Sequence, residues 1–162
     1  MIPEETPSDD EARAAALRLL ARREHTRREL TDKLGKRGFE PRIIGRVLDG
    51  LESDGLLDER RFAESFVRSR LDRGQGPLRI GGELRLRGVD GAVADEVLQQ
   101  AGDEAGVDWI ARAHAARARR FGPDVATDRR EAARQARFLE QRGFTAAQVR
   151  AALSGAPDDE RE

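Results

Sequence analysis

Few residues of this chain are of the types that carry out catalysis or hold a metal ion. Cysteine is absent, and the two histidines, His25 and His114, lie far apart and outside any zinc-binding spacing such as HExxH. There is no nucleophile elbow or Walker-type loop, and the glycine-rich stretch GQGP at 74–77 is more typical of a turn between helices than of a phosphate-binding loop. We therefore predict a protein that is not an enzyme and that uses no metal or cofactor.

Arginine is the abundant residue whose chemistry could serve a function here. The 162 residues include 30 basic and 31 acidic side chains, and every basic one except Lys33 and Lys36 is arginine. A guanidinium group binds phosphates and carboxylates through paired hydrogen bonds. The formal net charge of -1 nevertheless argues against a nucleic-acid partner, and a GC-rich genome would raise the arginine content whatever the function. Abundance alone therefore assigns no partner.

The distribution of charge along the chain changes this interpretation. Residues 1–11 hold five acidic side chains and no basic one, and residues 156–162 hold four acidic side chains against one basic, so the segment between them is net basic. Within that segment, residues 13–38 hold nine basic and three acidic side chains, whereas residues 89–108 hold six acidic and no basic ones. This separation predicts a molecule with one basic face and a partly acidic opposite face.

The elements that must position these charges are helices. Alanine, the strongest helix former, outnumbers valine and isoleucine together, and no stretch alternates apolar and polar residues as a half-buried strand would. The start signals are two capping boxes, two N-cap aspartates and two first-turn prolines, at Thr26 with Glu29, Thr145 with Gln148, Asp58, Asp108, Pro41 and Pro77. We expect helices at 11–23, 27–37, 41–53, 59–72, 77–87, 91–101, 108–120, 127–142 and 146–153.

Three glycines reveal an internal repeat. The stretches KLGKRGF (33–39), ELRLRGV (83–89) and FLEQRGF (138–144) place a leucine, an arginine, a glycine and an apolar residue in one register. Two expected helices precede Gly38, Gly88 and Gly143, and one follows each of them. The predicted fold is all-α, an elongated curved array of three tandem three-helix repeats of the helix-turn-helix type. The repeats are expected at 12–57, 58–107 and 108–155, between disordered acidic tails at 1–11 and 156–162.

Two neighbouring glycines, Gly81 and Gly82, are unexpected inside the helix predicted at 77–87. Each should cost about 1 kcal/mol of helix stability relative to alanine. Either packing holds this helix despite its low propensity, or the backbone of a partner approaches it closely. We favour the packing explanation.

The stretch DERRFAESFVRSRLDRGQGPLRIGGELRLRGV at 58–89 resembles the central signature of the RecX family of bacterial recombinase regulators. The segment from Leu17 to Leu57, including GLLD at 55–58, is similar to the N-terminal repeat of that family, and the resemblance extends over about 20–155. The matching positions of the signature are Asp58, Phe62, Ala63, Phe66, Arg70, Gly76, Ile80, Glu83, Leu84, Arg87 and Gly88. Most of these are residues that the fold needs, and not contacts to a partner.

The resemblance implies a cytoplasmic regulator without enzymatic activity. Proteins of this family bind the nucleoprotein filament of the RecA recombinase, inhibit its recombinase, ATPase and co-protease activities, and bind DNA with little sequence preference. We therefore expect RecA and DNA as partners, with an effect on DNA repair, homologous recombination and the SOS response. No membrane association is expected, and the protein is expected to be a monomer. The candidate contact residues on the basic face are Arg68, Arg70, Arg73, Arg79, Arg85, Arg87, Lys33, Lys36 and Arg37.

Two other interpretations remain open at this point. Residues 26–59 would pass for the helical part of a winged-helix or other helix-turn-helix transcriptional regulator, although a wing would need two alternating strands after Gly55 and a single reading head would not recur. A scaffold that binds a protein helix and no nucleic acid is the third interpretation. It predicts that reversing the charge of the basic face leaves DNA binding and its salt dependence unchanged.

Overall fold

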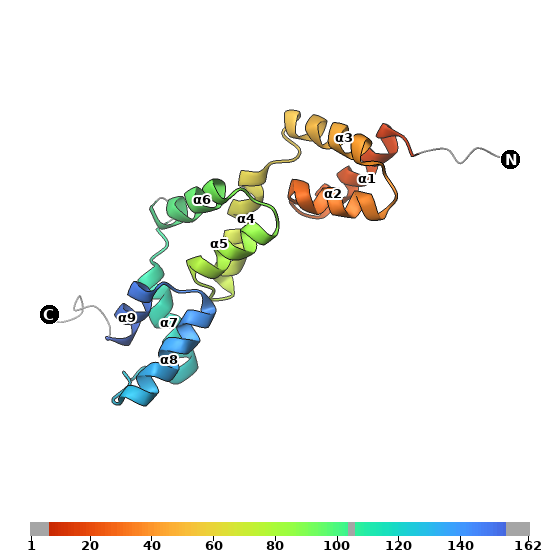
Figure 1. Ribbon diagram of the computed structural model, residues 1–162. Helices are drawn as coiled ribbons and strands as arrows, with labels where there is room; N and C mark the ends of the chain where they lie inside the picture. Colours follow the sequence, from red (N-terminus) through yellow and green to blue (C-terminus); the bar gives the residue numbers. More distant parts are fainter. Residues whose placement is uncertain (1–6, 104–105, 155–162) are drawn as a thin grey trace.

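The computed structural model describes residues 7–103 and 106–154, and all the regular elements in these ranges are α-helices. The helices are α1 (Asp9–Arg22), α2 (Arg27–Lys36), α3 (Pro41–Ser53), α4 (Glu59–Asp72), α5 (Pro77–Leu86), α6 (Gly91–Asp103), α7 (Trp109–Phe121), α8 (Arg129–Arg142) and α9 (Ala146–Leu153). They form three successive modules of three helices, which follow one another along an elongated, curved molecule (Figure 1). The all-helical array predicted from the repeats is confirmed.

The predicted start signals act as expected. Thr26 and Thr145 each accept a hydrogen bond from the backbone three residues later and complete a capping box, and Asp58 and Asp108 cap α4 and α7. The helix boundaries agree with the predicted ones to within two residues. Because α4 begins at Glu59, directly after Gly55 and its turn, the two strands that a wing would need there are replaced by a helix.

The first helix begins inside the segment that was predicted to be a disordered acidic tail. Ser8 accepts a hydrogen bond from the Glu11 N–H and caps α1, so Asp9 and Asp10 belong to the first helical turn and not to a disordered tail. Acidic side chains stabilise this position because the first turn of a helix carries partial positive charge. Residues 1–6 and the predicted C-terminal tail at 156–162 lie outside the described residues.

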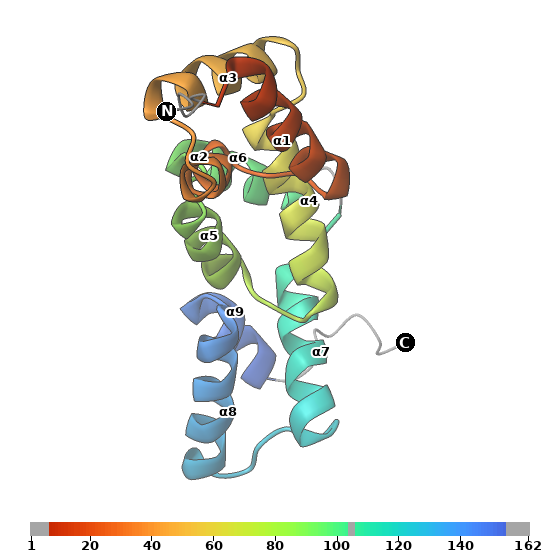
Figure 2. The same ribbon diagram turned by 90° about the vertical axis from the view of Figure 1, so that its right-hand side faces the viewer.

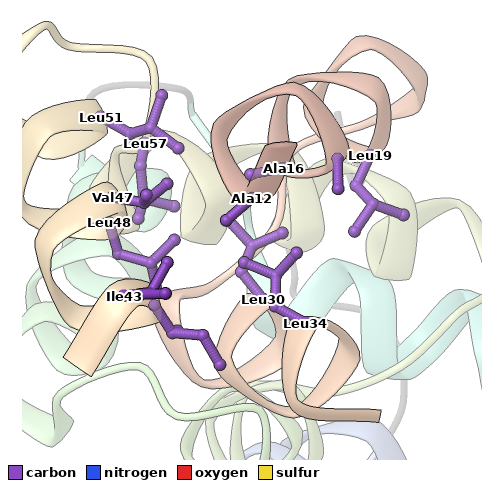
Figure 3. Close-up of a cluster of buried hydrophobic side chains, with 12 residues drawn as sticks. Ala12, Ala16, Leu19, Leu30, Leu34, Ile43, Val47, Leu48, Leu51 and Leu57 are labelled. Carbon is purple, nitrogen blue, oxygen red and sulfur yellow. The ribbon is translucent and has the colours of Figure 1, made fainter. Parts of the chain in front are cut away.

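Each module has its own hydrophobic core. Leu30 and Leu48 lie at the centre of the first, Leu84 in the second, and Leu139 with Phe144 in the third, and these side chains are almost entirely inaccessible to solvent. Figure 3 shows that the first core is made of side chains from α1, α2 and α3 that point toward one another. Three small cores need less apolar mass than one large globule, which explains how a chain with only 38% hydrophobic residues folds.

The modules are joined end to end through their second helices. At the joint between modules 2 and 3, the Gly76 and Leu78 N–H groups at the start of α5 donate hydrogen bonds to the Arg142 and Gly143 carbonyls at the end of α8, at 2.7 and 2.9 Å. Pro77, between the two donors, has no N–H to satisfy. Backbone groups that a helix end normally leaves without a partner are thus paired with those of the next helix.

The joint between modules 1 and 2 repeats this arrangement with a side chain. The Thr26 hydroxyl accepts from the Glu29 N–H at 3.1 Å and donates to the Arg87 carbonyl at 2.5 Å, so one group caps α2 and closes the end of α5. Arg61 adds a second link, because it donates to Glu24 of module 1 at 2.6 Å and to the Gly55 carbonyl of the connecting turn at 3.0 Å. The helices α8, α5 and α2 therefore form one column that runs through the molecule (Figure 2).

The repeated glycines have a dual role at these joints. All three end a helix with a positive φ, of 89° at Gly38, 96° at Gly88 and 95° at Gly143, which favours glycine. At the two joints the glycines also permit close approach, since a Cβ at Gly88 would lie 2.6 Å from the Arg28 Cβ and one at Gly143 would lie 2.5 Å from the Arg79 N. Gly38 lies at the end of the column, and a Cβ added to it would have no atom within 4 Å.

Candidate partner-binding groove

Arginines line a hollow between α4, the end of α5 and the loop that precedes α2. Its volume is about 380 Å³. The guanidinium-bearing side chains at its wall are Arg23, Arg70, Arg73 and Arg87, and two hydroxyls, of Ser65 and Ser69, lie beside them. The only carboxylate on its wall is Glu24, which is held by Arg61. A hollow with this lining attracts anionic groups and can offer them several hydrogen-bond donors.

The ring of Phe66 holds two of these arginines in place. The Arg70 and Arg87 guanidinium carbons lie 4.5 and 5.0 Å from the centroid of this ring. Glu83 forms an ion pair with Arg70, with 3.0 Å between Arg70 Nε and Glu83 Oε2. The geometry of this pair is not that of a hydrogen bond, and the buried Nε has no other acceptor among the described residues. Stacking on an aromatic ring orients a guanidinium while leaving its donors free at the edge. Arg87, which has no ion pair among the described residues, is therefore positioned in advance for an incoming anion, whereas Arg70 is already paired with Glu83.

A second hollow continues the first across the joint between modules 2 and 3. Arg73 lies on the wall of both, and the second is completed by Arg119 and Arg120 of α7 and by Arg142 at the end of α8. Arg142 stacks on Phe138 at 5.1 Å, as Arg87 stacks on Phe66 one module earlier. We call the two hollows together the arginine groove. It runs along the side of α4 and α7 that faces the column formed by α8, α5 and α2.

The acidic residues of the third helices are engaged elsewhere. Arg27 pairs with Asp49 of α3 at 2.9 Å, and Arg85 pairs with Asp95 of α6 at 2.9 Å. These pairs lie on the α3 and α6 side of modules 1 and 2, so the carboxylates there are balanced by arginines of the same module. Among residues 7–103 and 106–154, the groove arginines without an ion pair are Arg73, Arg87, Arg119, Arg120 and Arg142.

The structure brings three of the nine candidate contact residues together in this groove. Arg70 and Arg73 come from α4 and Arg87 from the end of α5, and all three line the first hollow. Arg68, on the same helix as Arg70, instead lines a mostly apolar hollow between α4 and α6, whose wall also includes Val97.

The remaining candidates lie outside the groove. Arg79 pairs with Glu83 at 3.2 Å beside the joint to α8, and Arg85 is turned toward α6 by its pair with Asp95. In module 1, the Lys33 ammonium lies 3.3 Å from Nε2 of the buried His25. Lys36 and Arg37 are exposed at the free end of the column.

The groove also contains arginines that were not among the candidates, namely Arg23, Arg119, Arg120 and Arg142. One signal for them was present in the sequence, because Arg142 precedes its glycine as Arg37 and Arg87 precede theirs. Nothing local marks the other three: Arg119 and Arg120 reach the groove because α7 follows α4 across a joint, and Arg23 because the end of module 1 lies beside α4.

Two findings bear on other kinds of site. Within the described ranges, no group of three or more histidine, cysteine, aspartate or glutamate side chains is arranged to hold a metal ion. In the same ranges, every helix is too short or too polar to cross a membrane.

Comparison with known proteins gives a consistent result for each module. Three family models match in order, described as the first, second and third three-helix domains of RecX, over residues 12–51, 58–98 and 107–153. The Regulatory protein RecX of Halorhodospira halophila is 60% identical over 153 residues, covering 94% of this chain and 92% of its own. That of Chromohalobacter salexigens is 46% identical over 158 residues, covering 98% and 97%.

Solved structures show the same fold. The crystal structure of RecX from Lactobacillus salivarius superposes with a TM-score of 0.77 at 23% identity, covering 90% of this chain and 94% of that one. A second crystal structure, of a regulatory protein RecX, has a TM-score of 0.74 at 22% identity and covers 88% of this chain and 70% of its own. The three family models match in chain order, and the identity to the two relatives extends over nearly the whole length. The chain therefore belongs to the RecX family.

Proposed function

We propose that this chain binds the nucleoprotein filament of the RecA recombinase and inhibits the recombinase, ATPase and co-protease activities of that filament. The observation that carries the proposal is the arginine groove, which crosses the joint between modules 2 and 3 and offers guanidinium groups without carboxylate partners. Membership of a family whose relatives are named as regulatory proteins supports a regulator. The proposal extends to cytoplasmic action in DNA repair and recombination, as a monomer.

The composite surface of a nucleoprotein filament suits this groove. Phosphates of the DNA and carboxylates of the protein are both ligands that guanidinium groups recognise. Contacts distributed over an elongated array add together, so modest affinity at each module yields firm binding overall. The balanced charge of the α3 and α6 side reduces the attraction of the molecule as a whole to free nucleic acid.

The direct test is an activity measurement with purified components. Substoichiometric amounts of this protein, added to RecA from the same cell, are expected to slow DNA-dependent ATP hydrolysis and strand exchange. The double variant Arg73→Gln/Arg87→Gln should need about ten times more protein for the same inhibition, since arginines at the centre of an interface are frequent hot spots.

A matched control removes two arginines elsewhere. Arg42 on α3 and Arg150 on α9 are exposed and line neither hollow, so the variant Arg42→Gln/Arg150→Gln has the same net charge as the groove variant. It should inhibit as the wild type does. If the wild-type protein, folded by circular dichroism, leaves both RecA activities unchanged across the titration, the proposed function is wrong.

A further inference from the structure

The middle helix of the middle module carries an apolar stripe on its solvent side. Leu78, Gly82 and Leu86 follow one another at intervals of four residues and therefore lie on one face of α5. That face is opposite the buried one, which Ile80 and Leu84 form. The leucines are 63% and 80% exposed, the highest values among the exposed large apolar side chains of the described residues. We call these three residues the α5 stripe.

The fold does not require apolar residues at these positions. The repeat places α2 and α8 in the same role as α5, and the glycine alignment identifies the corresponding positions. They are Arg28, Asp32 and Lys36 on α2, and Ala133, Arg137 and Gln141 on α8, all exposed. Five of these six side chains are polar or charged. The stripe is therefore particular to the second module, and stability of the repeat does not account for it.

Gly82 makes a notch between the two leucines. A Cβ added at Gly82 would meet no atom within 4 Å, whereas one at Gly81 would lie 3.2 Å from the Leu98 side chain of α6. Packing against α6 thus accounts for Gly81, as the sequence led us to favour, but not for Gly82. Two exposed leucines and an unexplained helix-destabilising glycine coincide on one face, and such departures from local rules gather at functional sites.

We propose that the α5 stripe docks the protein component of the filament, with a large apolar side chain of a recombinase protomer seated over Gly82 between Leu78 and Leu86. This inference rests on the proposed function. Leucine side chains offer nothing to phosphates, whereas the arginine groove does, so the two surfaces divide the work between protein and polyanion. Arg79 and Arg85, which pair with Glu83 and Asp95, flank the stripe on its two sides and give it a charged rim, in the usual pattern of an apolar interface centre with a polar rim.

A second copy of this chain fits the stripe poorly. A symmetric dimer through the stripe would place glycine against glycine and bring the Arg79 and Arg85 side chains of both copies together. Two leucines also bury far less than the roughly 1,000 Å² that a specific dimer interface needs. The partner protomer, with contacts along the whole array, does not have this limitation.

The test compares substitutions in the stripe with matched substitutions outside it. Gly82→Gln fills the notch with a good helix former, and Leu86→Gln removes an exposed apolar side chain. The controls are Gly35→Gln in α2, an exposed helical glycine with no atom within 4 Å of its added Cβ, and Ile110→Gln in α7, which is 42% exposed. Binding is measured to RecA filaments on single-stranded DNA and to the same DNA alone, and the oligomeric state by sedimentation.

Each stripe variant is expected to weaken filament binding about tenfold, to bind DNA alone as the wild type does, and to remain monomeric, while both controls bind filaments normally. Unimpaired filament binding by Gly82→Gln and Leu86→Gln would overturn this inference and leave the proposed function standing. A wild type that does not bind filaments would overturn both. A wild-type dimer that Leu86→Gln converts to a monomer would assign the stripe to a second copy and overturn the inference.

Discussion

His25 is a buried histidine with a hydrogen-bond partner on each ring nitrogen. Its Nδ1 lies 3.0 Å from the Arg23 carbonyl and its Nε2 lies 3.3 Å from the Lys33 ammonium, and the residue is 2% exposed. An ammonium can only donate, so Nε2 accepts and the ring is neutral with its proton on Nδ1. Burial lowers the pKa of His25, and the charges of Arg23 and Lys33 lower it further, against opposing effects of the Arg23 carbonyl and the Glu29 carboxylate.

This histidine predicts a loss of stability in mild acid. Because the folded pKa lies below the unfolded value of 6.5, the unfolded chain binds the proton more readily and the free energy of unfolding falls as the pH drops through 6.5. Urea unfolding between about pH 7.5 and pH 5.5 should show this decline, and His25→Gln should reduce it. Burial also lowers the pKa of His114, which contributes to the decline with the same sign, so His114→Gln should reduce it as well. An unchanged pH dependence in His25→Gln would contradict the prediction.

For single residues, the sequence indicated which types would line a basic surface but not which way each side chain points. It showed that arginine precedes each repeated glycine, and Arg87 and Arg142 do line the groove. Arg68 and Arg70 could not be told apart, because two residues along a helix point to different sides and the local sequence does not fix the rotation of α4.

Helix ends decide how the elements of this molecule meet. A start signal acts within four residues, which is why the boundaries of α2, α4 and α9 could be predicted from their caps. The joint between α8 and α5 brings together residues that are more than sixty positions apart. In the sequence Gly76 was part of a turn and a position of the family signature, and neither indicated that it contacts α8. No short stretch of sequence indicates that two modules approach each other closely. The helices of the column could therefore be predicted, but not their arrangement in a column.

Gly76 is the cleanest probe of that joint. Its φ of -87° suits any residue, but a Cβ there would lie 2.5 Å from the Gly143 backbone, so only the joint requires glycine. Gly76→Ala should push α5 away from α8 and lower the free energy of unfolding by about 1–3 kcal/mol, as overpacking does. Urea unfolding measures this loss, and amide exchange at Leu78 reports the broken hydrogen bond. Gly82→Ala, in open space on the same helix, should instead stabilise the protein by up to about 1 kcal/mol. A Gly76→Ala variant as stable as the wild type would contradict the prediction, because it would mean that α5 and α8 can move apart without loss of stability.

Over the whole molecule, the formal net charge of -1 is an average of surfaces that differ. Arginines facing α3 and α6 pair with carboxylates of these helices, whereas five arginines of the groove have no ion pair among the described residues. The repeat pattern and the segregation of charge made the array and a basic face predictable. The course of the groove across a joint was not, because it depends on how one module is rotated against the next.

The salt dependence of DNA binding reports on this surface. For single-stranded DNA the logarithm of the binding constant falls by about 0.7 per phosphate contact for each tenfold rise in salt. If Arg73 and Arg87 each contact a phosphate, Arg73→Gln/Arg87→Gln should make the slope shallower by about twice that amount, and Arg42→Gln/Arg150→Gln should leave it unchanged. Fluorescence anisotropy with a labelled oligonucleotide measures both slopes. Identical slopes for the groove variant and the wild type would favour the scaffold interpretation, in which nucleic acid is not a partner.

The column of second helices gives the molecule a sense of direction. The chain runs in the same sense along the column in α8, α5 and α2, because each joint connects the carbonyl end of one helix to the amino end of the next. The two tips are consequently unlike, with the first turn of α8 at one and the carbonyl end of α2, beside Gly38, at the other. A rod of this kind differs from its own reversal. If it lies along a filament whose protomers all point in one direction, it fits that filament in a single orientation. Its first and third modules then always contact the same side of a protomer.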